Sequence, residues 1–162
     1  MSGVARASGE HTGSGVATEA RRGAHFGNLR VLVVFESGRA GAAALREAAE
    51  LAGGGAELSV VTLAPQAKPF KCCGGGGPGP YNCAVRDQAH EELHEARSLL
   101  GSLADRATFT LLAGTPAPPL AEWSAEHSFD VILLPAPRLA RGGGRQARAL
   151  RRASPAEVRL VR

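Results

Sequence analysis

The stretch "RVLVVFESGRAGAAALREAAELA", residues 30–52, changes its apolar pattern once, near its middle. Its first part lies in the run "LRVLVVF", residues 29–35, which is rich in β-branched residues and has the length of a buried strand. The segment "ESGRAG" is predicted to be a loop, and residues 42–52 are predicted to form a helix that the glycines at 53–55 end. The apolar residues expected on one face of this helix are Leu45, Ala48, Ala49 and Ala52. The stretch therefore predicts one strand–helix unit.

The same alternation continues to the end of the chain. Further strands are predicted at 56–64 ("AELSVVTLA"), 107–113 ("ATFTLLA"), 129–136 ("FDVILLPA") and 157–161 ("EVRLV"), the last of them at an edge. A short helix is predicted at 118–128 and another at 145–153, the latter burying Ala147, Leu150 and Ala153. A long helix precedes the third strand, and its expected apolar face consists of Val85, Ala89, Leu93, Ala96, Leu100 and Leu103.

Four strand–helix units closed by a last strand predict an α/β fold. We expect one doubly wound, Rossmann-like sheet of five mainly parallel strands with helices on both faces, because right-handed crossovers produce that arrangement. In such sheets ligands bind beyond the carboxyl ends of the strands, where the winding direction switches. The corresponding segments here are residues 35–38 ("FESG") and 134–137 ("LPAP").

Composition divides the chain into a tail and one domain. Residues 1–28 are rich in Gly, Ser, Ala and Thr without an apolar period, so they are predicted to be a disordered tail. The domain is expected to span 29–162, with an irregular Gly/Pro/Cys insertion at 65–82. Aromatic residues make up only 4% of the chain, so Val, Leu, Ile and Ala must form the core. No apolar run is long enough to span a bilayer and no secretory signal is recognisable, so we expect a cytoplasmic protein without membrane contact.

The net charge of +4 hides a strong asymmetry. Residues 138–162 contain eight arginines and one acidic residue, Glu157, whereas the remainder contains eleven basic and fourteen acidic residues. Such a basic end attracts anions. Nucleic acid is nevertheless not expected as a partner, because there is no recognition motif, few aromatics are available for stacking, and Ala147 and Leu150 are needed for the fold.

The chain resembles the universal stress protein family over about residues 29–162. The resemblance is carried by "RVLVVFESGRAGAAALREAAELA", "AELSVVTLA", "LLAGTPAPPLAEWSAEHSFDVILLP" and "ARALRRASPAEVRLV", in that order and spacing. Its most characteristic part is Gly114-x-Pro116 followed by a helix, Phe129-Asp130 and an aliphatic strand. The resemblance implies a five-stranded parallel sheet, a homodimer formed through the last strand, a role in stress response without catalysis and, in one branch, binding of adenine nucleotides such as ATP.

The nucleotide motif of that branch is altered in this chain. The family's aspartate after the first strand, which lies near the adenine and ribose, corresponds to Glu36. The phosphate-binding pattern is Gly-x-x-Gly, about nine residues, then Gly-Ser/Thr; here it reads Pro135-x-x-Arg138, five residues, then Gly144-Arg145. Proline removes an amide donor, and the hydroxyl is lost. The conventional phosphate cradle is therefore expected to be broken, so that no cofactor is certain.

Two interpretations of this loop stay open. In one, the triglycine is a flexible turn and the arginines form a solvated face. In the other, a nucleotide or another anion binds at the helix N-terminus and makes the protein an anion-responsive switch. The candidate residues for that site are Glu36, Ser37, Gly38, Arg138, Gly142, Gly143, Gly144 and Arg145.

The cysteines and histidines suggest a further alternative. Cys72, Cys73 and Cys83 could form a thiol-based redox sensor, since thiols on flexible backbone can pair on oxidation. His90 and His94 share a helix face, but there is no Cys-x-x-Cys spacing and nearby arginines disfavour a cation, so no metal site is predicted. No nucleophile–base–acid set is recognisable, and the chain is expected to act as a binding or regulatory module without catalytic residues.

Overall fold

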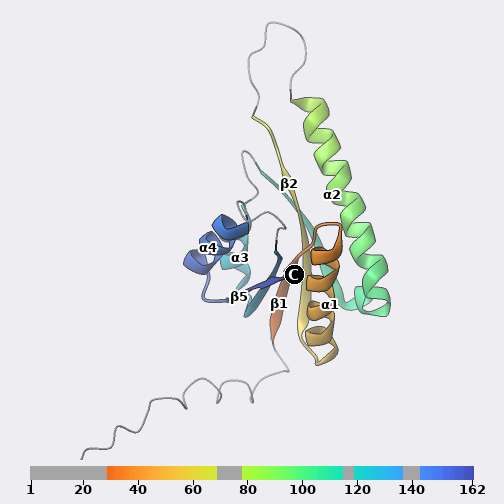
Figure 1. The fold of residues 1–162 in the computed structure, drawn as a ribbon, viewed down its shortest axis with the longest axis vertical. Helices are drawn as coiled ribbons and strands as arrows, with labels where there is room; N and C mark the ends of the chain where they lie inside the picture. The colour runs from red at the N-terminus through yellow and green to blue at the C-terminus, as the bar shows by residue number, and fades with distance from the viewer. Residues whose placement is uncertain (1–28, 69–77, 115–118, 137–142) are drawn as a thin grey trace, which may run out of the picture.

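The computed structural model describes residues 29–68, 78–114, 119–136 and 143–162, which form a single sheet with helices on both faces (Figure 1). The strands are β1 (Arg30–Val34), β2 (Glu57–Pro65), β3 (Ala107–Gly114), β4 (Val131–Pro135) and β5 (Glu157–Val161). The helices are α1 (Arg39–Gly53), α2 (Gly79–Leu100), α3 (Leu120–His127) and α4 (Gly143–Ala153), with a 3₁₀ turn η2 (Gly101–Arg106). None of the described helices is both long and apolar enough to cross a bilayer.

The strand order is β3-β2-β1-β4-β5 and every pairing is parallel, including that of the last strand. This confirms the predicted five-stranded α/β fold. The chain winds outward from β1 in both directions, so the winding reverses between β1 and β4. The carboxyl ends of these two neighbouring strands form the edge at which a ligand is expected.

Two apolar layers hold the helices against the sheet. One face is covered by α1 and α2, and the other by α3 and α4 (Figure 1). Residues of the central strand β1 pack alternately into the two layers, because successive side chains of a strand point to opposite faces of the sheet. Val31, Val33 and Phe35 belong to the first, and Leu32 and Val34 to the second; all are almost fully buried.

Helix faces follow the predicted apolar periods with a few exceptions at the helix ends. Leu45, Ala48 and Ala52 of α1, Ala89, Leu93, Ala96 and Leu100 of α2, and Ala147 and Leu150 of α4 are buried as predicted. The prediction for Ala153 was wrong: it is exposed, because at 100° per residue it lies about 120° around the helix axis from the buried Ala147. The next residue, Ser154, returns to the side of Ala147 and is buried. Leu103 is not in the long helix either, since Gly101, with φ of 55°, ends α2 and leads into the 3₁₀ turn.

The structure also corrects three predicted boundaries. Helix α1 begins at Arg39 rather than residue 42, because the Ala42 N–H already donates to the carbonyl of Gly38 at 2.9 Å; the "ESGRAG" loop is correspondingly shorter. The irregular segment 65–82 is shorter at both ends. Pro65 is still paired with Gly114 in the sheet, and α2 begins at Gly79, with a proline tolerated in its first turn. The 1–28 tail and residues 69–77 lie outside the described residues.

The Phe129-Asp130 pair anchors the start of β4. Phe129 is buried in the second layer, and its ring lies 5.4 Å from that of Trp123. The Asp130 carboxylate accepts the backbone N–H of Arg30 at 2.8 Å, and its carbonyl accepts the N–H of Glu157 at 2.8 Å. Asp130 therefore connects the amino ends of β1, β4 and β5, which explains this part of the sequence pattern by strand alignment.

Candidate functional site

The predicted site residues of the first strand follow β1 directly at its carboxyl end. The backbone continues in the sheet through Phe35, whose N–H donates to the carbonyl of Val61 at 2.8 Å. Glu36, Ser37 and Gly38 then form an exposed loop before α1. On the neighbouring strand, the Ala136 N–H donates to the carbonyl of Val161 at 2.7 Å, which extends the sheet by one residue beyond β4. The two strand ends predicted to form a site therefore lie side by side.

Glycines fix the path of the loop after β1. Gly38 has φ of 120°, a conformation that residues with a Cβ rarely adopt. Gly41 packs so closely on the loop that a Cβ there would lie 1.8 Å from the carbonyl oxygen of Glu36. Helix α1 therefore lies directly against the backbone of Glu36, and this position can accept only glycine without a shift of the loop.

Ser37 is held from the other side by α2. Its hydroxyl donates a short hydrogen bond to the Glu95 carboxylate, and its backbone N–H donates to Glu92. Burial raises the pKa of Glu92, and the charges of Glu36 and Glu95 raise it further, against the opposing effect of its hydrogen bonds from Ser37 and Gln88. Three carboxylates, Glu36, Glu92 and Glu95, therefore surround Ser37; we call this group the Ser37 carboxylate cluster.

Sequence reasoning identified Glu36 and missed Glu92 and Glu95. Both lie more than fifty residues beyond the loop along the sequence, in the helix that also contains His90 and His94. A signal was present: both glutamates adjoin residues of the helix's apolar face, Leu93 and Ala96, and so had to lie near the sheet. Only the packing of α2 over β2 shows that they reach the end of β1.

The second half of the predicted site is described only in part. Arg138 and Gly142 lie outside the described residues, so the structure does not test their roles. Helix α4 begins at Gly143, and Gly144 and Arg145 in its first turn are exposed. No polar contact between these residues and the Ser37 carboxylate cluster occurs among the described residues, and joint binding by the two halves stays a prediction.

The carboxylate cluster limits the chemistry that the β1 side can support. A carboxylate such as Glu36 accepts hydrogen bonds from ribose hydroxyls or an adenine amine. Three carboxylates near one loop repel the multiple negative charges of a polyphosphate. The arrangement favours a neutral or singly charged polar ligand over a triphosphate at this strand end.

The redox candidates are only partly described. Cys83 is a free, exposed thiol within the first turns of α2 and not in a loop, whereas Cys72 and Cys73 lie outside the described residues. His90 and His94 are exposed on α2. Within the described ranges no three His, Cys, Asp or Glu side chains gather as metal ligands. The redox pairing stays untested.

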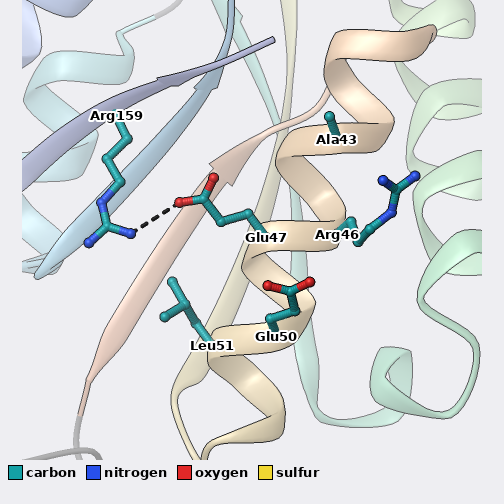
Figure 2. Close-up of a pocket in the computed structure, with 6 residues that line it drawn as sticks. All are labelled: Ala43, Arg46, Glu47, Glu50, Leu51 and Arg159. Carbon is teal, nitrogen blue, oxygen red and sulfur yellow. Dashed lines mark hydrogen bonds and ion pairs between the residues drawn. The ribbon is translucent and has the colours of Figure 1, made fainter.

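A separate hollow of about 420 Å³ lies between α1 and β5, away from the predicted site (Figure 2). Its lining residues are Ala43, Arg46, Glu47, Glu50, Leu51 and Arg159. The Arg159 guanidinium donates to Glu157 at 2.9 Å and to Glu47 at 3.0 Å. Both hydrogen bonds raise the pKa of Arg159, and the bond to Glu157 has the larger effect. Arg46 extends away from Arg159 in Figure 2, so the two cations do not converge on one anion. We assign the hollow no ligand.

Of the comparisons with known proteins, the one with solved structures supports the fold. No protein-family model matches the chain, and no curated protein matches its sequence. Among solved structures, universal stress protein UspA from Lactobacillus plantarum is similar with a TM-score of 0.62 and 18% identity, over 83% of this chain and 97% of that one. A universal stress protein from Archaeoglobus fulgidus is similar with a TM-score of 0.57 and 23% identity, over 83% and 98%.

A third solved structure carries a ligand. It is described as a universal stress protein in complex with cAMP, and it is similar with a TM-score of 0.50 and 20% identity, over 83% of this chain and 96% of that one. The parallel order β3-β2-β1-β4-β5, with two helices on each face, agrees with these similarities along nearly the whole length of the matched structures. The described part of this chain therefore has the universal stress protein fold.

Proposed function

We propose that this chain is a non-enzymatic binding and regulatory module of the universal stress protein type, acting in stress response. The proposal depends on one observation: the carboxyl ends of β1 and β4 lie side by side at the winding switch, with Glu36 exposed on a loop that α1 and α2 hold in place. A fixed loop with an exposed acceptor is suited to binding a polar ligand at this edge.

The ligand class we propose is an adenine nucleoside or a singly charged adenine nucleotide. The Ser37 carboxylate cluster favours such a ligand over ATP by electrostatic repulsion. The neighbour in complex with cAMP supports this class, because cAMP has one negative charge and presents an adenine and a ribose hydroxyl. The departures from the phosphate motif at Pro135 and Arg145 also argue against a triphosphate.

Isothermal titration calorimetry with adenosine, cAMP, AMP and ATP tests this proposal on the full chain. We expect adenosine and cAMP to bind more tightly than AMP, and ATP to bind most weakly. Glu36→Gln should weaken adenosine binding about tenfold, because a charged acceptor is replaced by a neutral one. Glu126→Gln, at an exposed position on α3, is the matched control and should bind as the unmodified chain does.

Two outcomes would contradict the proposal. If ATP binds most tightly, the arginines beyond β4 dominate and the anion-responsive switch is the better account. If no nucleotide or nucleoside produces heat at millimolar concentration, the strand ends do not form an adenine site.

We further propose that the module is a homodimer formed through β5. This strand is at the edge of the sheet, and an edge strand has unpaired backbone groups that can bond to a second chain. Leu160 of β5 is 44% exposed and would gain apolar contact in such an interface. Native mass spectrometry of freshly purified protein tests this, with Leu160→Glu expected to shift the dimer toward monomer; a monomeric unmodified chain would contradict it.

A further inference from the structure

The exposed side of α4 is the most strongly basic surface among the described residues. Four of the eight consecutive positions 145–152 are arginines, and all four are exposed: Arg145, Arg148, Arg151 and Arg152. The helix contains no acidic residue. Neighbouring α3 has Glu122 and Glu126, but the ion pairs of the described ranges involve only Arg30 and Arg159 as cations.

Three of these arginines share one side of the helix. At 100° per residue, Arg145, Arg148 and Arg152 lie within about 60° of one another around the axis, and the first and last are separated by about 10 Å along it. Arg151 points elsewhere, since its guanidinium donates to the carbonyl of Val158 at 3.1 Å. No hydrogen bond or ion pair engages the other three within the described part of the chain. We call them the α4 arginine face.

Packing and charge occupy opposite sides of α4. Ala147 and Leu150 are buried against the sheet, as the fold requires. From sequence alone, the packing role of Ala147 and Leu150 competes with a binding role for the same segment. The structure removes that objection, because the arginines point to solvent while the apolar residues point inward.

The residues around the α4 arginine face favour one of three anionic partners: an acidic protein, an anionic membrane or a nucleic acid. Protein interfaces depend on large apolar or aromatic side chains at their centre. The apolar side chains on the exposed side of α4 are only the small ones of Ala149 and Ala153. An interfacial membrane helix needs an exposed apolar face, but here that face is buried in the domain. Interfaces with nucleic acids are polar and strongly basic, and guanidinium groups bind phosphates in a bidentate manner.

We propose that the α4 arginine face binds the phosphate backbone of nucleic acid without base specificity. Each arginine that neutralises a phosphate releases condensed counterions, and this release drives the binding. The absence of stacking aromatics on α4 fits a contact with the backbone alone. This proposal does not depend on the adenine site. The two share one candidate residue, Arg145 in the first turn of α4, whereas Arg148 and Arg152 belong to the α4 arginine face alone.

Fluorescence anisotropy with a fluorescein-labelled 20-base-pair DNA duplex of mixed sequence tests the proposal on the full chain. Three arginine contacts predict a slope of log affinity against log salt of about −2.7. The variant Arg145→Gln/Arg148→Gln/Arg152→Gln should bind at least about tenfold more weakly at 20 mM salt, with its slope reduced by about 2 to 3.

The matched control is Arg39→Gln/Arg46→Gln/Arg106→Gln, which removes the same charge from exposed positions of α1 and η2. It should bind DNA within about twofold of the unmodified chain. The proposal is overturned if the control loses as much affinity as the α4 variant, since net charge alone would then explain binding. It is also overturned if poly-L-glutamate of equal charge displaces the duplex as well as unlabelled DNA does, or if phosphatidylserine vesicles bind more tightly than DNA.

Discussion

Helices α2 and α4 lie on opposite faces of the same sheet and use the same kind of residue to pack against it. Each buries alanines and leucines: Ala89 and Leu93 are examples in α2, and Ala147 and Leu150 are the pair in α4. Their solvent sides are opposite in charge. Helix α2 has four acidic residues and two arginines, whereas α4 has four arginines and no acid.

The charged residues of the two helices are also used differently. Glu92 and Glu95 of α2 turn toward the loop after β1 and hold Ser37 in place. Of the four arginine side chains of α4, only that of Arg151 forms a hydrogen bond among the described residues, with the carbonyl of Val158. Burial therefore determines which side of a helix faces the sheet. The other side is free either to stabilise a neighbouring loop, as in α2, or to bind an external partner, as proposed for α4.

The largest effect on stability is expected where α1 packs against the loop after β1. Gly41→Ala places a Cβ 1.8 Å from the Glu36 carbonyl oxygen, so the loop must move or the helix must shift. We expect a loss of more than about 3 kcal/mol in the free energy of unfolding. Gly53→Ala is the control, because nothing lies within 4 Å of its added Cβ. Urea denaturation measures both, and equal stabilities would contradict the close packing of this loop.

The next effect concerns the buried side of α4. Leu150→Ala removes a fully buried side chain and should lower the free energy of unfolding by about 3 kcal/mol. The same substitution at Leu99, which is 55% exposed on α2, should cost less than about 1 kcal/mol. If the two variants are equally stable by urea denaturation, α4 does not pack on the sheet as described, and the separation of packing from charge fails.

A smaller loss of stability is expected when the hydrogen bond between β2 and α2 is removed. The Thr62 hydroxyl donates to the carbonyl of Ala89 at 3.0 Å and is fully buried. Thr62→Val should cost about 1 kcal/mol, because a buried hydrogen bond is lost while the volume is conserved. Thr110→Val on β3 is a half-buried comparison and should be nearly neutral. Thermal unfolding of the two variants measures the difference, and a neutral Thr62→Val would show that this bond does not stabilise α2.

The smallest effect is a pH dependence in the Ser37 carboxylate cluster. The pKa of Glu92 is raised in the folded state, so its contribution to stability is fully present below its unfolded pKa and is lost as the pH rises through the folded pKa. Glu92→Gln removes the charge and keeps an oxygen that can accept the Ser37 N–H. At pH 7 we expect this variant to be more stable than the unmodified chain by about 0.5 kcal/mol or less, because solvent screens a partly exposed group. This gain in stability should vanish near pH 4, where Glu92 is protonated. If Glu92→Gln is less stable than the unmodified chain at pH 7, the charge of Glu92 does not destabilise the folded state.

Much of the fold follows from sequence because its signals are local. The β-branched runs and the three- and four-residue apolar steps predict strands and helices, and their alternation restricts the topology to a parallel sheet. The errors lie at helix ends. Leu103 lies in the 3₁₀ turn after Gly101 ends α2, and Ala153 lies at the end of α4, about 120° around the axis from the buried Ala147. The candidate site was harder to predict: Glu36 follows a recognisable strand, but Glu92 and Glu95 join it only through packing.

The sequence by itself determined the order of strands and helices, the inward faces of α1, α2 and α4, and the basic end of the chain, because side-chain period and charge are properties of neighbouring residues. Only the tertiary structure shows which charged side chains contact each other or a neighbouring loop. It brought two glutamates of α2 to Ser37, placed Gly41 against Glu36 and left the α4 arginine face without an acidic partner in the described residues. The reason is physical: electrostatic and steric contacts depend on distance in space, and the parallel crossovers bring together residues that are far apart along the chain.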